Sequence, residues 1–190
     1  METEIKNIIE ESIAVKRKVA DQLVNKIRQA AEQITQSYNQ GGKLLLFGNG
    51  GSAADAQHIA CELIHQFEIS RRKCLLALAL NTNTSVATAI GNDWSFEEIF
   101  ERQVEGLANP EDVVIGISTS GNSANVVRGL RQANDNGAFT IALGGKDGGK
   151  IAELANLAII VPSDNTARIQ ESHIMIGHII CRLVEQGLFA

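Results

Sequence analysis

The sequence predicts an α/β fold: a five-stranded parallel sheet with helices on both faces and helices before the first strand. Two observations support this class. Short, nearly continuous apolar segments lie at 43–47, 75–80, 113–117, 139–143 and 157–161, as is typical of strands buried on both faces. Longer segments with three- and four-residue apolar spacing separate them, as expected for helices that connect parallel strands.

The first helical region covers residues 5–39. Its isoleucines, valines and leucines recur at three- and four-residue spacings, and we expect two helices with a break near 19–21. This region has too many apolar positions for free surface helices. We therefore expect residues 1–40 to form a helical extension that packs against other subunits.

Helical patterns also follow each strand. They cover 52–66, 84–90, 96–107, 123–134, 150–155 and 166–188. No repeat, linker or low-complexity segment interrupts the alternation. We therefore predict one domain over residues 1–190.

Composition excludes several classes of function. The 17 Lys and Arg residues against 22 Asp and Glu residues give a formal net charge of -5, which provides no basic surface for nucleic acid. No stretch approaches 18 uninterrupted apolar residues, and the charged first residues lack a signal sequence, so we expect a cytoplasmic protein without a membrane segment. The 3 cysteines form no CxxC pair, and we expect them to be buried packing residues.

Two short loops favour the binding of a phosphate. Residues 48–52 (GNGGS) follow the first strand and residues 118–123 (STSGNS) follow the third, and each opens a helix. Glycines let the backbone approach a ligand, hydroxyls donate hydrogen bonds, and helix N-termini present free N–H groups. Two such loops on one sheet predict a phosphorylated small molecule.

Other interpretations of the glycine loop are weaker. Gly48-x-Gly50-x-x-Ala53, with Glu68 downstream, partly matches a dinucleotide fingerprint, but such a site does not need the four hydroxyls of the second loop. A P-loop is excluded because no Gly-Lys-Ser/Thr follows the required gap. Helix capping alone would explain one serine in each loop. A sugar phosphate fits the pattern best.

Candidates for the chemistry lie on two predicted helices. His58 and Glu62 stand four residues apart on one face of the helix after the first loop, as a metal pair or a base with its orienting partner. Gln170 and His178 are polar positions among the isoleucines of the last helix. Either histidine alone is more often a satisfied structural group.

Several ordered motifs resemble one family. They are GNGGSAADAQH (48–58), AIGND (89–93), GISTSGNS (116–123), KDGG (146–149) and ARIQESH (167–173). Together they are similar to the phosphoheptose isomerases of the sugar isomerase (SIS) domain family, over nearly the whole chain. The resemblance implies a flavodoxin-like, three-layer sandwich.

The resemblance also implies roles for individual residues. The phosphate and nearby sugar hydroxyls would be held by Asn49, Gly50, Gly51, Ser52, Ser118, Thr119, Ser120, Ser123 and Gln170, and the sugar also by Asn92 and Asp93. Glu62 would be the general base, also touching substrate, and His178 the general acid. A zinc ion would be bound by His58, Glu62, Gln170 and His178. Gln170 and His178 are about 12 Å apart along one helix, so one site holding both would be completed across subunits, in keeping with the family's homotetramer.

The implied reaction is the aldose–ketose isomerisation of sedoheptulose 7-phosphate to D-glycero-D-manno-heptose 7-phosphate through an enediol(ate), which begins heptose supply for lipopolysaccharide. One segment departs from the family: Ile64-His65-Gln66-Phe67 stands where Thr-Gly-Arg-Tyr is usual, so Gln66 replaces an arginine. Arg71 and Arg72 are candidates to supply its charge. This segment instead resembles a related non-catalytic adaptor that binds the bacterial replication initiator.

The adaptor is the alternative function, and a sugar-phosphate-sensing regulator is a third. Glu62 and His178 favour the enzyme, because the adaptor lacks them at these positions. The regulator is the weakest interpretation because no DNA-binding domain is attached.

Overall fold

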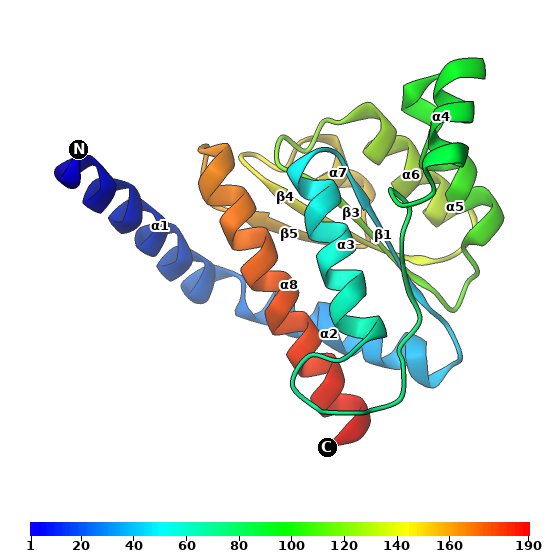
Figure 1. Ribbon diagram of the computed structural model, residues 1–190, viewed down its shortest axis with the longest axis horizontal. Helices are drawn as coiled ribbons and strands as arrows, with labels where there is room; N and C mark the ends of the chain where they lie inside the picture. Colours follow the sequence, from blue (N-terminus) through cyan, green and yellow to red (C-terminus); the bar gives the residue numbers. More distant parts are fainter.

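The computed structural model describes all 190 residues and contains the predicted five-stranded parallel sheet (Figure 1). Its strands are β1 (Leu44–Gly48), β2 (Ala77–Ala79), β3 (Val113–Ser118), β4 (Phe139–Gly145) and β5 (Leu157–Val161). They lie in the order β2-β1-β3-β4-β5, and every neighbouring pair is parallel. This is the flavodoxin-like order, in which ligands bind at the carboxyl ends of β1 and β3, where the strand order reverses.

Helices cover both faces of the sheet, which confirms the three-layer prediction. On one face lie α2 (Val24–Asn39), α3 (Gly51–Ile64) and α8 (Thr166–Phe189), which share a continuous apolar core with the sheet. On the other lie α5 (Glu101–Leu107), α6 (Ala124–Asp135) and α7 (Gly149–Leu154), around a second core that includes Phe47 and Phe100. The helix α4 (Thr84–Asp93) packs on the 3-10 turn η1 (Phe96–Glu98) at the rim of this layer.

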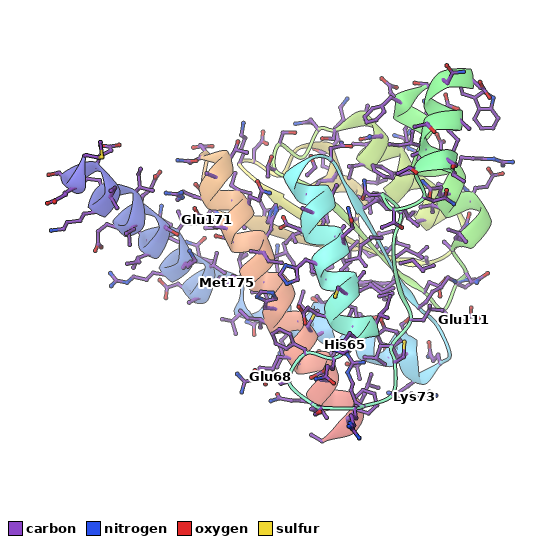
Figure 2. The ribbon with its side chains drawn as sticks, viewed as in Figure 1. His65, Glu68, Lys73, Glu111, Glu171 and Met175 are labelled. Carbon is purple, nitrogen blue, oxygen red and sulfur yellow. The ribbon has the colours of Figure 1, made fainter.

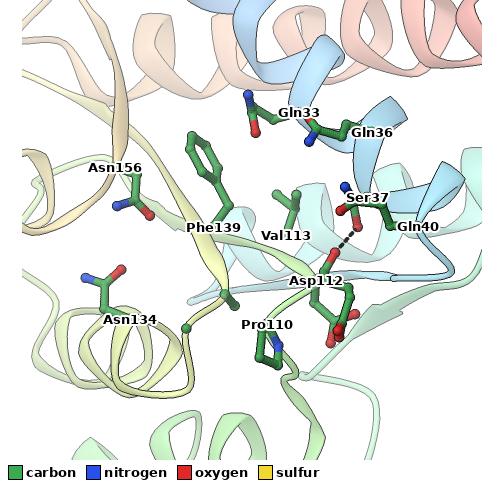
Figure 3. Close-up of a pocket in the computed structure, with 13 residues that line it drawn as sticks. Gln33, Gln36, Ser37, Gln40, Pro110, Asp112, Val113, Asn134, Phe139 and Asn156 are labelled. Carbon is green, nitrogen blue, oxygen red and sulfur yellow. Dashed lines mark hydrogen bonds between the residues drawn. The ribbon is translucent and has the colours of Figure 1, made fainter.

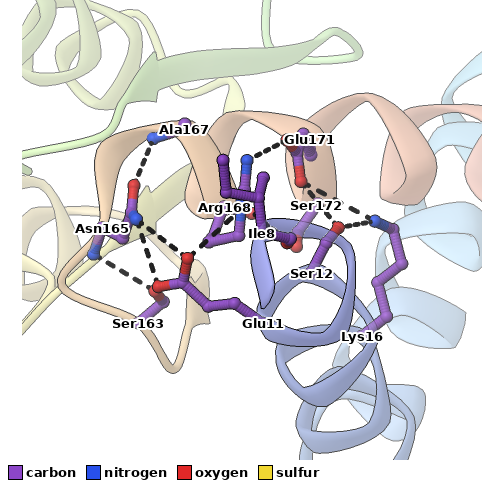
Figure 4. A network of polar contacts seen from close by, with 10 residues as sticks. All are labelled: Ile8, Glu11, Ser12, Lys16, Ser163, Asn165, Ala167, Arg168, Glu171 and Ser172. Carbon is purple, nitrogen blue, oxygen red and sulfur yellow. Dashed lines mark hydrogen bonds and ion pairs between the residues drawn. The ribbon is translucent and has the colours of Figure 1, made fainter. Parts of the chain in front are cut away.

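The first helix, α1 (Glu2–Gln22), extends away from the sheet (Figure 1). It bends into α2 at Leu23, slightly later than the predicted 19–21, because Leu23 keeps its N–H bonded to Val19 while its side chain turns into the core. Arg168 joins α1 to the start of α8: its guanidinium donates to the Ile8 carbonyl at 2.8 Å and to the Glu171 carboxylate at 2.5 Å (Figure 4).

Three further differences from the sequence prediction concern β2, residues 96–107 and the cysteines. β2 is limited to three residues because it is an edge strand that pairs only with Leu44 to Leu46 of β1. The segment predicted as one helix over 96–107 divides into η1 and α5. Of the cysteines, only Cys181 is buried; Cys61 and Cys74 are exposed, so the expectation that all three are packing residues is wrong. None of the helices has the length and apolarity needed to cross a bilayer.

Candidate functional site

Two anion loops, residues 48–52 and 118–123, leave the carboxyl ends of neighbouring strands. The register pairs Gly48 of β1 with Ile117 of β3, so the loops emerge side by side at the point where the strand order reverses. Gly50 takes a φ of 55°, a left-handed conformation that favours glycine, and this turn leads directly into α3. The structure therefore brings together the two loops that were predicted from the sequence to bind phosphate.

Hydroxyl groups gather in the second loop. The Ser118 Oγ lies 3.0 Å from the Ser123 Oγ and 3.4 Å from the Ser120 Oγ, so three of the four predicted hydroxyls converge. The N–H groups of Ala124 and Asn125, in the first turn of α6, have no acceptor within the protein. Hydroxyl donors beside free N–H groups and the positive end of a helix dipole suit a dianion.

Amide side chains fix the first loop, and two of them, Asn81 and Asn125, were not predicted as site residues. Asn49 does not point freely toward a ligand: its side chain exchanges two hydrogen bonds, of 2.8 and 2.9 Å, with Asn125 of α6. Asn81, directly after β2, donates to the Gly48 carbonyl at 2.8 Å. The position of Asn81 behind a strand was an available signal, because parallel strands end at the same edge of the sheet. The pairing of Asn49 with Asn125 left no trace in local sequence.

The helices α3 and α8 run alongside each other from this edge. Gly51 lies so close to Gln170 that a Cβ at position 51 would be 1.7 Å from the Gln170 Nε2, and Gly177 likewise meets Ile59. These two contacts fix how α3 and α8 lie alongside each other. The eight-residue step from Gly51 to Ile59 in α3 runs beside the seven-residue step from Gln170 to Gly177 in α8. The glycines thus let the two helices approach closely enough for their side chains to share one site.

Further along this pair, His58, Glu62 and His178 form an imidazole–carboxylate cluster. The His58 Nε2 lies 3.1 Å from the Glu62 Oε1 and 3.3 Å from the His178 Nε2, and one potential ligand atom of each residue lies within 4.8 Å of the others. Two ring nitrogens this close cannot both carry a proton without repulsion, so at least one presents a lone pair. One chain thus supplies both candidate catalytic residues, Glu62 and His178.

The cluster fits a small divalent cation. Two imidazoles and a carboxylate are ligands that zinc accepts, and bonds of about 2.0–2.1 Å would place neighbouring ligand atoms at roughly the two shorter separations observed here. Glu62 is shielded, with 23% of its side chain exposed, while His58 is open to solvent on one side. Three protein ligands leave room for a fourth group.

Three predicted site residues lie outside the imidazole–carboxylate cluster. Gln170 contacts Gly51 at the first anion loop, about 12 Å along α8 from His178, so it does not join the cluster of its own chain. Asn92 and Asp93 are exposed at the end of α4, where the Asn92 side chain donates a hydrogen bond of 2.7 Å to the Asp93 carboxylate. The helix α4 packs mainly on η1, at the rim of the other layer, and not on α3 or α8, which carry the cluster.

Two titratable side chains are buried between the loops and the cluster. Desolvation raises the pKa of Asp55 to about 6, against the opposing charge of His58, and one carboxylate oxygen has no partner. Desolvation lowers the pKa of His173 to about 4, although its Nε2 lies 2.9 Å from the Gly144 carbonyl. Asp55 in α3 and His173 in α8 lie at about the same distance along the helix pair from the Gly51–Gln170 contact. Both are therefore neutral, or nearly so, in mildly acidic solution.

The unusual segment after α3 has a specific conformation. The Gln66 side chain accepts the Arg71 N–H at 3.0 Å and so closes a turn. Arg72 is buried and bonded to Glu185 and to the Glu62 carbonyl, so it does not offer a free charge in place of the missing arginine. Phe67 stacks on His178, with ring centroids 5.4 Å apart.

A separate polar cavity of about 430 Å³ lies at the opposite, amino end of the strands (Figure 3). Val113 and Phe139, the first residues of β3 and β4, line it together with amide side chains such as Gln33 and Asn156. It contains none of the predicted site residues. In parallel sheets ligands bind at the carboxyl ends of the strands, so the anion loops remain the candidate site.

Comparisons with known proteins agree with this location. Residues 8–145 match the model of the SIS domain family. A phosphoheptose isomerase of Aquifex aeolicus is 55% identical over 182 residues, covering 96% of this chain and 95% of the relative. One from Trichlorobacter lovleyi is 50% identical, covering 100% and 96%. The solved phosphoheptose isomerase of Neisseria gonorrhoeae superposes with a TM-score of 0.92 at 43% identity, covering 97% of this chain and 98% of the other.

Proposed function

Because the chain belongs to the phosphoheptose isomerase family of SIS-domain proteins, we propose that it converts sedoheptulose 7-phosphate to D-glycero-D-manno-heptose 7-phosphate, a cytoplasmic step that supplies lipopolysaccharide heptose. The observation that carries the proposal is the imidazole–carboxylate cluster formed between α3, which begins at the first anion loop, and α8. The non-catalytic adaptor is a weaker candidate, since this chain keeps both Glu62 and His178.

The mechanism divides binding from proton transfer. The anion loops hold the phosphate through Ser118, Ser120, Ser123 and the N-terminus of α6, far from the carbons that react. Glu62 removes the proton next to the carbonyl, an enediol(ate) forms, and the proton returns at the neighbouring carbon. His178 protonates and deprotonates the sugar oxygens through the ring nitrogen that does not face His58. Binding energy from the remote phosphate orients C1 and C2 against Glu62.

We propose that zinc occupies the cluster, with His58, Glu62 and His178 as ligands from one chain. When bound, the ion would polarise a sugar oxygen and stabilise negative charge on it. The chelator dependence of the activity tests this assignment. Activity that survives complete removal of zinc, with no metal in the protein by elemental analysis, would contradict it.

A homotetramer formed through the residues 1–40 extension is the second part of the proposal. Ile5, Ile8 and Ile9 are exposed on α1, and an apolar cavity of about 430 Å³ lies between α1, α2 and α8, with Met175 and Ile179 among its lining residues. Burial of these surfaces against other copies would remove apolar area from water. It would also allow Gln170, Asn92 and Asp93 to reach the cluster of a neighbouring chain.

Subunit mixing distinguishes these contributions. Glu62 and His178 belong to the cluster of one chain, so each subunit of a mixed Glu62→Gln and His178→Ala assembly still has a defective cluster. Mixing these two inactive variants should therefore restore little activity. Glu62→Gln mixed with Gln170→Ala should restore part of it if Gln170 acts on a neighbour. A fully active monomer in ultracentrifugation would refute the tetramer.

The direct test is incubation of the purified protein with sedoheptulose 7-phosphate, with and without chelator, followed by detection of heptose 7-phosphate. Product formation that requires the phosphate group supports the proposal. Absence of product with metal-loaded, folded protein would refute the proposed isomerase activity. Binding to a replication initiator would then be measured to test the adaptor alternative.

A further inference from the structure

His178 is enclosed by two rings. The His58 imidazole meets it edge-on, with centroids 4.9 Å apart and an interplanar angle of 71°, and the Phe67 ring lies nearly parallel to it at 5.4 Å and 28°. Phe67 belongs to the loop between α3 and β2 and is half-buried against the core. The orientation of His178 therefore depends on where this loop places Phe67.

A buried carboxylate on α8 holds that loop through its backbone. Glu185, seven residues after His178 and 1% exposed, accepts the N–H groups of Phe67 at 2.7 Å, Glu68 at 2.8 Å and Ile69 at 2.9 Å. Figure 2 shows His65, Glu68 and Lys73 on the loop as it passes around the C-terminal half of α8. Three successive N–H groups on one carboxylate fix the loop at the residue that touches His178.

Arg72 also binds Glu185, and we call these two side chains the clamp. Arg72 connects the clamp to α3. Its Nε donates to Glu185 at 2.5 Å and its Nη2 donates to the Glu62 carbonyl at 2.7 Å. Burial would raise the pKa of Glu185, but hydrogen bonds from the Phe67 N–H, the Arg72 guanidinium and the next two N–H groups outweigh it and lower the pKa to about 2. The carboxylate is thus ionised throughout the range in which an isomerase would work.

A buried ion pair is a poor way to obtain stability alone, because desolvation offsets most of the attraction between the charges. This pair instead joins three segments at the residues next to the chemistry: Glu62, Phe67 and, two turns away on the same helix face, His178. From these contacts we propose that Glu185 and Arg72 are positioning residues, which hold Phe67 against His178 and so orient its imidazole for proton transfer.

This inference rests on the proposed isomerase function, and three variants test it. Glu185→Gln weakens the clamp, and Phe67→Leu removes the ring while keeping an apolar side chain on an intact loop. Arg182→Gln is the matched control, since Arg182 forms an exposed 3.2 Å ion pair with Glu68 between the same loop and helix. We expect kcat to fall roughly 10- to 100-fold in the first two variants, with KM within about two-fold, because sub-ångström misplacement of a catalytic group costs rate.

The second readout does not depend on turnover. The chain has 4 histidines, so His178 is assignable in NMR spectra of 13C-histidine protein with the help of His178→Gln. A stacked phenyl ring displaces the resonance of the imidazole through its ring current. Phe67→Leu should abolish this displacement, Glu185→Gln should reduce it, and Arg182→Gln should leave it unchanged.

Two outcomes would overturn the inference. Unchanged kcat in Phe67→Leu would show that the ring does not orient the acid, and a Glu185→Gln protein with lower thermal stability but an unmoved His178 resonance would make the clamp structural only. Phe67→Leu decides the matter if Glu185→Gln does not fold. Wild-type protein that shows the ring-current displacement but no isomerisation would contradict the proposed function while leaving the geometry intact.

Discussion

The anion loops lie at the carboxyl ends of β1 and β3, whereas the imidazole–carboxylate cluster lies between α3 and α8, and the two regions are assembled differently. The loops use backbone N–H groups and hydroxyls contributed by contiguous stretches of sequence, and their side chains carry no formal charge. The cluster uses titratable groups, His58 and Glu62 from α3 and His178 from α8, separated by more than a hundred residues of sequence. One region is thus local and electrically neutral, while the other depends on tertiary packing.

The difference suggests a division of labour. Neutral donors bind a dianion in any protonation state of the protein, so they suit a permanent anchor. Converging nitrogen and oxygen atoms exchange protons or hold a metal, so they suit the reacting end. Substitutions in the loops should therefore change KM, and substitutions in the cluster should change kcat.

The largest expected effect is in the cluster. Glu62→Gln should lower kcat by roughly 10²–10⁴-fold with KM nearly unchanged, because the amide keeps the shape but cannot accept a carbon-bound proton. Exchange of solvent deuterium into C1 or C2 of the substrate gives an independent measurement. Glu68→Gln, an exposed carboxylate on the following loop, is the control. Comparable deuterium exchange by Glu62→Gln and wild type would remove Glu62 from the role of base.

A smaller and opposite pattern is expected in the loops. Ser120→Ala and Ser123→Ala should each raise KM roughly 10- to 100-fold with kcat preserved, because a hydrogen bond to a charged group contributes about 1.5–3 kcal/mol. The exposed Ser85→Ala is the matched control. Steady-state kinetics with the phosphorylated and unphosphorylated sugar measure the effect. Equal turnover of both sugars would refute the assignment of the loops to phosphate.

The same contrast explains what could be predicted from sequence. Strand and helix order followed from apolar periodicity, and the loops followed from glycines and hydroxyls beside strands, since both signals are local. The pair of His58 with Glu62 was also readable from its four-residue spacing. The addition of His178 was implied only by family resemblance, because nothing in local sequence aligns α8 with α3.

Tertiary contacts account for what the sequence did not reveal. The alignment of the two helices depends on Gly51 meeting Gln170 and Gly177 meeting Ile59, which periodicity does not encode. That alignment puts Gln170 beside Gly51 of the first anion loop and not in the cluster of its chain. Likewise, the role of Arg72 depends on Glu185, more than a hundred residues away.

The smallest effect on catalysis is expected in the layer between the two regions, where a substitution should change the stability of the protein. His173 is fully buried with its pKa lowered from 6.5 to about 4, so between these values the unfolded chain binds more protons than the folded one. Its contribution to the free energy of unfolding is therefore complete above pH 6.5 and is lost as the pH falls to about 4. The loss is on the order of 3 kcal/mol.

Asp55 acts in the opposite sense, because its pKa is raised to about 6 and its contribution is lost as the pH rises from 3.8 through 6. The two dependences offset each other in the wild type. Urea unfolding from pH 4 to 7 should therefore show that His173→Gln gains stability on acidification relative to wild type, whereas Asp55→Asn loses it and the exposed His65→Gln follows wild type. A pH-independent difference between His173→Gln and wild type would mean that burial does not hold His173 neutral. Because His173 bonds to the Gly144 carbonyl and to neither region of the site, this change in stability should occur with kcat and KM close to their wild-type values.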